Sequence, residues 1–227
     1  MPTRVIFFDV GNTLLFPNRA RILAPLQQRG HQATLEQWLA VERKTKPEFD
    51  QILEKGARID HGFWWIFYTQ LLHGLELAAD DVLRDALVAN TQLSANWDQI
   101  RPGTPESLQR IGRDYPIAVI SNADGKIDAV LRRCGIAECF QSITDSGIIG
   151  HEKPDPVIFA AALQEMKAKA AESLYVGDVY SVDYLGARNA GMQAVLFDVA
   201  GAYRDRNLPR VESLEGLETW LKQQALE

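Results

Sequence analysis

The sequence predicts an α/β fold in which a parallel sheet is interrupted by an all-helical insertion. Two observations support this prediction. Short apolar segments alternate with helical patterns over most of the chain, and residues 17–99 show helical patterns only. Hydrophobic residues make up 46% of the 227 residues, which is enough for a packed core and argues against disorder. The length suits one domain with a smaller insertion.

Five short segments predict buried strands. The first is the run Val-Ile-Phe-Phe at residues 5–8, whose continuous apolar character is typical of a strand covered on both faces. Four later segments have a similar character: residues 115–122, 139–146, 173–178 and 192–199. Their spacing along the chain favours parallel strands joined by right-handed crossovers.

Four helical patterns connect the later strands, at residues 104–113, 125–134, 155–170 and 181–190. Asp155 and Pro156 form a cap followed by a proline at the first helical position, which marks a helix start. Gly135 and Gly191 follow two of the patterns and are typical helix stops.

The interval 17–99 contains amphipathic patterns, including a helix predicted over residues 34–46, and no convincing buried strand. Both ends of the interval contain proline or glycine residues, which are typical of turns. We therefore predict a sheet-containing domain of residues 1–16 and 100–227 and a helical domain of residues 17–99.

The composition limits the partners and the location that we expect. The net charge is −6, and the Lys and Arg residues are scattered, so nucleic acid is not expected as a partner. Two cysteines, Cys134 and Cys139, are too few for a disulfide framework or a zinc site. The N-terminus lacks a signal-peptide pattern and no 18-residue apolar run is present, so we expect a cytoplasmic protein without a membrane partner.

Polar residues gather at the predicted carboxyl ends of the strands, where open α/β sheets bind their ligands. They are Asp9, Ser121, Asn122, Asp178, Asp183 and, in a loop before a helix, Lys153. Taken singly, each has an ordinary role as a turn, cap or surface residue. Together they point to a site, because carboxylates buried at close range repel one another and need a cation. Oxygen donors favour Mg²⁺ over zinc.

Magnesium and a lysine together suit the binding of a phosphoryl group. An aspartate such as Asp9 can then act as the nucleophile and form an aspartyl-phosphate. Ser121 and the amide of Asn122 are candidates for binding phosphate oxygens, and Lys153 can balance charge on both the nucleophile and the phosphate.

Four motifs in order carry a family resemblance. The pattern Asp-x-Asp-x-Thr stands here as Asp-Val-Gly-Asn-Thr at residues 9–13, and Ser121 is a strand-end serine. Lys153 precedes Pro-Asp-Pro, and Gly-Asp at residues 177–178 is followed by Asp183. Over residues 4–200 the sequence thus resembles the haloacid dehalogenase (HAD) superfamily hydrolases that carry a helical cap after the first strand.

The resemblance implies a Rossmann-like parallel sheet as the HAD-like core, with residues 17–99 as an inserted α-helical cap. It also implies Asp9 as the nucleophile, oriented by Thr13, and a Mg²⁺ ion. The metal ligands would be Asp9, the backbone carbonyl of Gly11 and Asp178, with Asp183 in or just outside the metal shell. The expected substrate is a small phosphorylated metabolite, and the expected protein is a monomer or homodimer.

Gly11 departs from the family pattern. The family's second aspartate protonates the leaving alcohol and then activates water, and general acid–base catalysis of this kind contributes about 10²–10⁴-fold to the rate. Three hypotheses follow: a Mg²⁺-dependent phosphatase that is slow or restricted to easy leaving groups, a 2-haloacid dehalogenase, and a non-catalytic binding module. The retained Lys153 and Asp178 favour the phosphatase.

The aromatic residues within 63–68 are expected to form mainly the core of the cap. Trp64 and Tyr68 share one helical face at i and i+4, so one of them can also reach the site.

Overall fold

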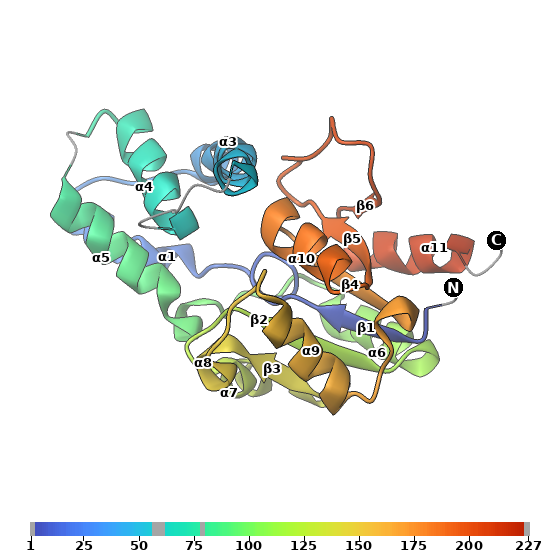
Figure 1. The fold of residues 1–227 in the computed structure, drawn as a ribbon. Coiled ribbons are helices and arrows are strands. Elements are labelled where there is room, and N and C mark those ends of the chain that lie inside the picture. Colours follow the sequence, from blue (N-terminus) through green and yellow to red (C-terminus); the bar gives the residue numbers. More distant parts are fainter. Residues whose placement is uncertain (1–2, 56–61, 78–79, 225–227) are drawn as a thin grey trace.

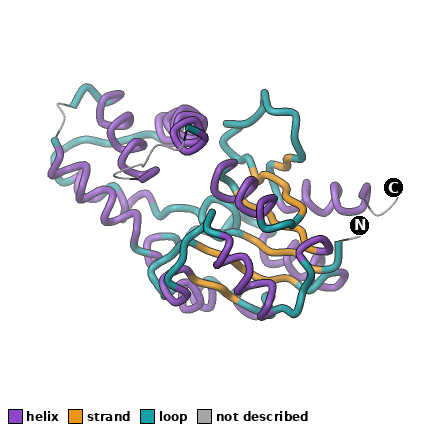
Figure 2. The backbone as a smooth tube through the Cα atoms, viewed as in Figure 1, coloured by secondary structure: helices purple, strands orange, loops and turns teal. Residues whose placement is uncertain are grey.

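A computed structural model of the chain describes residues 3–55, 62–77 and 80–224. Within these residues six strands, all parallel, form one sheet in the order β3-β2-β1-β4-β5-β6. Figure 2 shows the strands in orange, with helices packed around them. Their bounds are β1 Val5–Phe8, β2 Ile117–Ser121, β3 Ile143–Asp145, β4 Ser173–Gly177, β5 Gln193–Phe197 and β6 Arg210–Val211. The predicted Rossmann-like α/β fold is confirmed, although β3 is shorter than predicted and the two-residue β6 was not predicted.

Helices cover both faces of the sheet, as the apolar strands require. On one face lie α6 (Thr104–Asp114), α7 (Ile127–Arg133) and α11 (Leu214–Gln224), and on the other lie α9 (Pro156–Glu165) and α10 (Leu185–Asn189). A short helix, α8 (Ser146–Ile149), follows β3. Successive side chains of β1 alternate between the faces, so Ile6 and Phe8 pack on the first helix layer and Phe7 on the second. All three are fully buried, which contributes about 1.5–3 kcal/mol each.

Among the described residues, five α-helices lie between β1 and α6: α1 (Arg19–Ile22), α2 (Ala24–Gln27), α3 (Leu35–Glu54), α4 (Gly62–Gly74) and α5 (Asp81–Gln92). We call them the helical insertion. They bury their own apolar cluster, which includes Leu26, Trp38, Phe67 and Leu87. Figure 1 shows α3, α4 and α5 gathered beside the sheet rather than in either of its helix layers. None of the helices within the described ranges is both long and apolar enough to cross a membrane.

Helix α3 is longer than the predicted 34–46. It begins with a capping box, in which the Thr34 hydroxyl accepts from the backbone of Gln37 and the Gln37 side chain accepts from the backbone of Thr34. Pro47 removes one backbone donor without ending the helix, because Phe49 and Asp50 beyond it are buried. The extension carries Asp50, whose Oδ1 accepts a hydrogen bond from the backbone N–H of Ser181 at 2.9 Å.

Candidate active site

Asp9 stands directly after β1, in a tight turn that returns the chain toward Leu15. Its backbone N–H donates to the carbonyl of Val176 at 2.8 Å, which holds the end of β1 against β4. Asn12 adopts a positive φ of 53°, a conformation that asparagine tolerates better than most residues, and its N–H donates to the Leu15 carbonyl at 2.8 Å. The turn therefore fixes Asp9 at the carboxyl edge of the sheet, as predicted.

Lys153 lies at the centre of the acidic residues and is not a surface lysine. Its Nζ donates to Asp9 Oδ1 at 2.6 Å, to the Tyr175 hydroxyl at 2.7 Å and to Asp183 Oδ1 at 2.8 Å. Its side chain is 2% exposed. Burial alone would lower the pKa of Lys153, but Asp183 and Asp9 outweigh it and raise that pKa above its ordinary value. The lysine therefore stays charged and holds one oxygen of Asp9.

Asn122 positions this lysine through the backbone. Its Oδ1 accepts from the Lys153 N–H at 2.7 Å, and its Nδ2 donates to the Lys153 carbonyl at 3.0 Å. Ser121 is buried and lines the cavity in front of Asp9. Thr13 is buried too, but its hydroxyl has no hydrogen-bond partner in the part of the chain that the structure describes. Phosphate binding by Ser121 and Asn122, and orientation of Asp9 by Thr13, stay predictions.

Asp183 is locked against the end of β4 by both of its carboxylate oxygens. Oδ2 accepts from the backbone N–H groups of Asp178 at 3.0 Å and Val179 at 2.9 Å, while Oδ1 binds Lys153 and the Tyr175 hydroxyl. A π-helical turn, Tyr180–Tyr184, brings the carboxylate into this place. A Cβ at Gly177 would lie 2.5 Å from the Asp183 carboxyl carbon, so only glycine fits there. This contact explains the Gly-Asp pattern and its spacing from Asp183.

The carboxylates of Asp9, Asp178 and Asp183 each offer an oxygen, and these oxygens lie within 4.8 Å of one another. The hydrogen bonds of the described residues use Oδ1 of Asp9 and Oδ2 of Asp178, so the other oxygen of each is available to a ligand. Burial raises the pKa of Asp9 to about 7, against the lowering effect of Lys153, and raises the pKa of Asp178 to about 6, against that of Lys46. At both carboxylates the effect of burial on the pKa is therefore larger than the effect of the neighbouring lysine.

Lys46, which was not among the predicted site residues, reaches this site from α3. Its Nζ lies 2.8 Å from Asp178 Oδ2 and 2.7 Å from Glu42 Oε1, and its side chain is 1% exposed. Burial opposes the charge of Lys46, but Asp178 and Glu42 raise its pKa well above the ordinary value. The only sequence signal was a Glu-Lys pair at i and i+4, which usually lies on a solvated helix face.

The buried charges of the site do not cancel. Four carboxylates face two ammonium groups, and all six side chains are buried: Asp9, Glu42, Asp178 and Asp183 with Lys46 and Lys153. One divalent cation would balance the two excess negative charges. Carboxylate oxygens are also the ligands that Mg²⁺ prefers, so the site fits this ion.

The raised pKa of Asp9 predicts a pH-dependent stability in metal-free protein. A folded-state pKa of about 7, above the ordinary 3.8, favours folding fully below pH 3.8, and this contribution is lost as the pH rises through 7. Asp9→Asn removes the titration, so its melting temperature relative to wild type should rise between pH 4 and 8, by several degrees. Thermal unfolding in EDTA measures this, with the exposed Asp81→Asn as a flat control. A difference in melting temperature between Asp9→Asn and wild type that does not change with pH would contradict the prediction.

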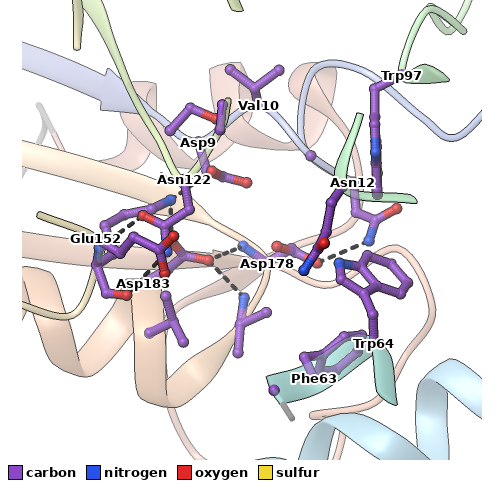
Figure 3. Close-up of a pocket in the computed structure, with 18 of the residues that line it drawn as sticks. Asp9, Val10, Asn12, Phe63, Trp64, Trp97, Asn122, Glu152, Asp178 and Asp183 are labelled. Carbon is purple, nitrogen blue, oxygen red and sulfur yellow. Dashed lines mark hydrogen bonds and ion pairs between the residues drawn. The ribbon is translucent and has the colours of Figure 1, made fainter. Parts of the chain in front are cut away.

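A cavity of about 760 Å³ opens in front of these residues, between the sheet edge and the helical insertion. Asp9, Ser121 and Lys153 line it from the sheet side. Trp64 lines it from α4, and Figure 3 shows Trp64 across the cavity from Asp9. Tyr68, in contrast, is fully buried in the core of the helical insertion, where its hydroxyl bonds Thr91. The aromatic segment thus serves mainly as core, and Trp64 reaches the site.

The place of the family's second aspartate is covered by an indole ring. A Cβ at Gly11 would lie 3.5 Å from Cζ3 of Trp97, and the indole Nε1–H of Trp97 donates to the Thr91 carbonyl at 2.7 Å. The indole is therefore held over the glycine. Asp124 and Glu152 line the same cavity, in addition to Asp9, Asp178 and Asp183.

Comparison with known proteins now decides the family. The family model for haloacid dehalogenase-like hydrolases matches residues 3–191. The chain belongs to this family. It is therefore a hydrolase of the HAD superfamily, as the four motifs predicted.

Two relatives and one solved structure are similar to this hydrolase over most of its length. It is 29% identical over 210 residues to haloacid dehalogenase-like hydrolase domain-containing protein 3 of Danio rerio, covering 87% of this chain and 86% of the relative. It is 30% identical over 197 residues to a glyceraldehyde 3-phosphate phosphatase of Methanothermobacter thermautotrophicus, covering 85% and 84%. The magnesium-bound HAD hydrolase YfnB of Bacillus subtilis shares the fold, with a TM-score of 0.72 at 18% identity over 97% of this chain and 99% of that one.

Proposed function

We propose that this hydrolase is a Mg²⁺-dependent phosphatase that acts on a small phosphorylated metabolite through an aspartyl-phosphate at Asp9. The observation that carries the proposal is the state of Asp9: Lys153 holds its Oδ1, while Oδ2 accepts no hydrogen bond from any described residue and Asp9 lines the cavity. The cavity volume of about 760 Å³ lies within the range of small-molecule sites. A relative named glyceraldehyde 3-phosphate phosphatase supports the reaction class.

Each residue has a defined task in this proposal. Asp9 attacks the phosphorus in its ionised form, which Lys153 favours, and Lys153 also offsets charge that builds on the phosphoryl oxygens. Ser121 donates to a phosphate oxygen, and Asn122 holds the backbone of Lys153 in place. Thr13 orients the turn that carries Asp9.

Asp9, the carbonyl of Gly11 and Asp178 are the residues that would hold the metal. Mg²⁺ supplies charge neutralisation and orientation of the phosphoryl group. Asp183 lies outside this set in the proposal, because both of its oxygens already accept hydrogen bonds from the protein. Its task is to position Lys153 and the end of β4.

We further propose the division into a core of residues 1–16 and 100–227 and a cap of residues 17–99. The separate apolar cluster of the helical insertion supports this division. The insertion also supplies Phe49, Phe63 and Trp64 to the cavity, so it is placed to select the substrate and exclude water.

The two other hypotheses from the sequence are less well supported. A dehalogenase binds a carboxylate substrate, which the excess negative charge of Asp9, Asp178 and Asp183 would repel. A non-catalytic binding module leaves the hydrogen bond from Lys153 to Asp9 without a purpose, although the protein maintains three buried partners around that ammonium group.

Phosphate release from p-nitrophenyl phosphate tests the proposal. We expect turnover with millimolar Mg²⁺ and a loss of about 10²-fold or more in EDTA, restored by added Mg²⁺, because two unbalanced buried charges would face the phosphate dianion. Chloride release from 2-chloropropionate should be undetectable under both conditions. Phosphate release that is equal with and without metal, or absent in both, would refute the proposal.

A further inference from the structure

The side of the cavity next to Gly11 is a continuous wall of aromatic rings. Neighbouring ring centroids are separated by 5.6 Å between Trp97 and Trp64, 5.0 Å between Trp64 and Phe63, and 5.4 Å between Phe63 and Phe49. All four side chains line the cavity. Figure 3 shows Trp97, Trp64 and Phe63 bordering one side, with Asp9 and Asp183 on the other. We call these four residues the aromatic wall.

The charged residues around the cavity do not suit a second phosphate. Lys153 is the one cation that lines it among residues 3–55, 62–77 and 80–224, and its three donor contacts are already made. Asp124 and Glu152 also line the cavity and carry negative charge. The part of the substrate beyond the phosphoryl group therefore meets apolar rings and acids rather than cations.

Gly11 also favours an aromatic leaving group. Without a side-chain acid at residue 11, the leaving oxygen departs as an anion. A phenol has a pKa of about 10, whereas water, which resembles an alcohol in this respect, has one of about 16. An aryl oxide is thus a far better leaving group than an alkoxide, and its ring is also what the aromatic wall can stack upon.

We propose that the preferred substrate of this site is a monophosphate ester of a phenol, an aryl phosphate, whose ring packs against Trp97 and Trp64. This inference rests on the phosphatase activity proposed above. An oxygen of Asp9 bonds to phosphorus as the bond from phosphorus to the aryl oxygen breaks. The electron pair leaves on the aryl oxide, which then takes a proton from water. A second water attacks the aspartyl-phosphate at phosphorus, restoring the Asp9 carboxylate and releasing phosphate, while its proton passes to solvent.

Binding of a phosphonate that cannot be hydrolysed tests the ring preference without any reaction. Isothermal titration calorimetry in Mg²⁺ would compare benzylphosphonate with propylphosphonate, which carries the same charged group and no ring. We expect benzylphosphonate to bind about 10-fold more tightly or better, as stacking on a tryptophan predicts. Equal dissociation constants for the two phosphonates would overturn the proposal.

Two adjacent tryptophans provide a matched pair of variants. Trp64→Leu should reduce the preference for benzylphosphonate about 10-fold. Trp65→Leu should leave it unchanged, because Trp65 does not line the cavity and its ring instead packs under the guanidinium group of Arg84. Phe63→Leu gives a second readout from the aromatic wall if Trp64→Leu does not fold. A preference that survives both Trp64→Leu and Phe63→Leu would contradict stacking on the wall.

Turnover of phenyl phosphate and glycerol 3-phosphate separates this inference from the proposed function. We expect kcat/KM to be higher for phenyl phosphate by about 10²–10⁴-fold, the usual contribution of the missing acid. Equal kcat/KM values for the two esters would overturn the aryl preference without contradicting the proposed phosphatase activity. Tight binding of benzylphosphonate without turnover of either ester would support the aromatic binding site and refute the proposed phosphatase activity.

Discussion

Replacing Asp9 by asparagine is expected to lower phosphate release by about 10⁴-fold or more, the scale of loss seen when a covalent nucleophile is removed. The amide has nearly the same shape as the carboxylate but lacks the ionised oxygen that attacks phosphorus. Lys153 keeps Asp183 and Tyr175 as partners, so the surroundings of the site should persist. Initial rates with p-nitrophenyl phosphate in saturating Mg²⁺ measure the loss.

The matched control for this prediction is Asp81→Asn, whose carboxylate is 74% exposed on α5 and should leave the rate unchanged. Rapid acid quenching and mass spectrometry of the intact chain should detect one added phosphoryl group on wild type and none on Asp9→Asn. Retention of more than about a hundredth of the wild-type rate would mean that Asp9 is not the nucleophile.

Replacing Lys46 by methionine is expected to cost about 3–5 kcal/mol of unfolding free energy in EDTA, because it leaves Asp178 and Glu42 as buried charges without their partner. Methionine retains most of the apolar length of the side chain, so the loss reports mainly on charge. Added Mg²⁺ should reduce the loss, since a cation at Asp178 replaces part of the missing charge. Urea unfolding with and without Mg²⁺ measures both values.

Lys44→Met is the matched control on the same helix, because Lys44 is exposed and its removal should change the stability by no more than about 0.5 kcal/mol. The double variant Glu42→Gln with Lys46→Met should recover part of the lost stability, because it also removes one unpaired charge. If the loss in Lys46→Met is the same with and without Mg²⁺, Lys46 acts only in the packing of α3.

The sheet and the polar residues at its edge were predictable because their signals are local. The apolar run of β1 followed by Asp9, and the Gly-Asp end of β4, each indicate a strand that delivers a carboxylate. The parallel order of the strands then brings distant residues to one edge, which is how Lys153 comes to bind Asp9 across 144 positions of sequence. Local pattern and topology were sufficient for this part of the site.

The contribution of the helical insertion was not predictable in the same way. Lys46 and Glu42 have the spacing of a solvated pair, and nothing near them in sequence shows that Asp178 lies beside them. Trp97 likewise precedes the sheet domain by a few residues and gives no sign that it covers Gly11. Such contacts depend on how the helical insertion meets the edge of the sheet, which periodicity does not encode. β6 has only two residues, too few for a periodic pattern, whereas α11 has the helical spacing of Leu214, Leu217 and Leu221 and was simply not among the predicted helices.

The close contact between Gly177 and Asp183 constrains how this sequence can diverge. Any side chain at position 177 would push the Asp183 carboxylate away from the backbone of Asp178 and from Lys153. A substitution at position 177 is therefore tolerated only if the second aspartate is lost or moved at the same time. No single substitution at position 177 or 183 preserves the buried hydrogen bonds of Asp183. We therefore expect glycine at 177 and aspartate at 183 to be retained together while other positions of the sequence change.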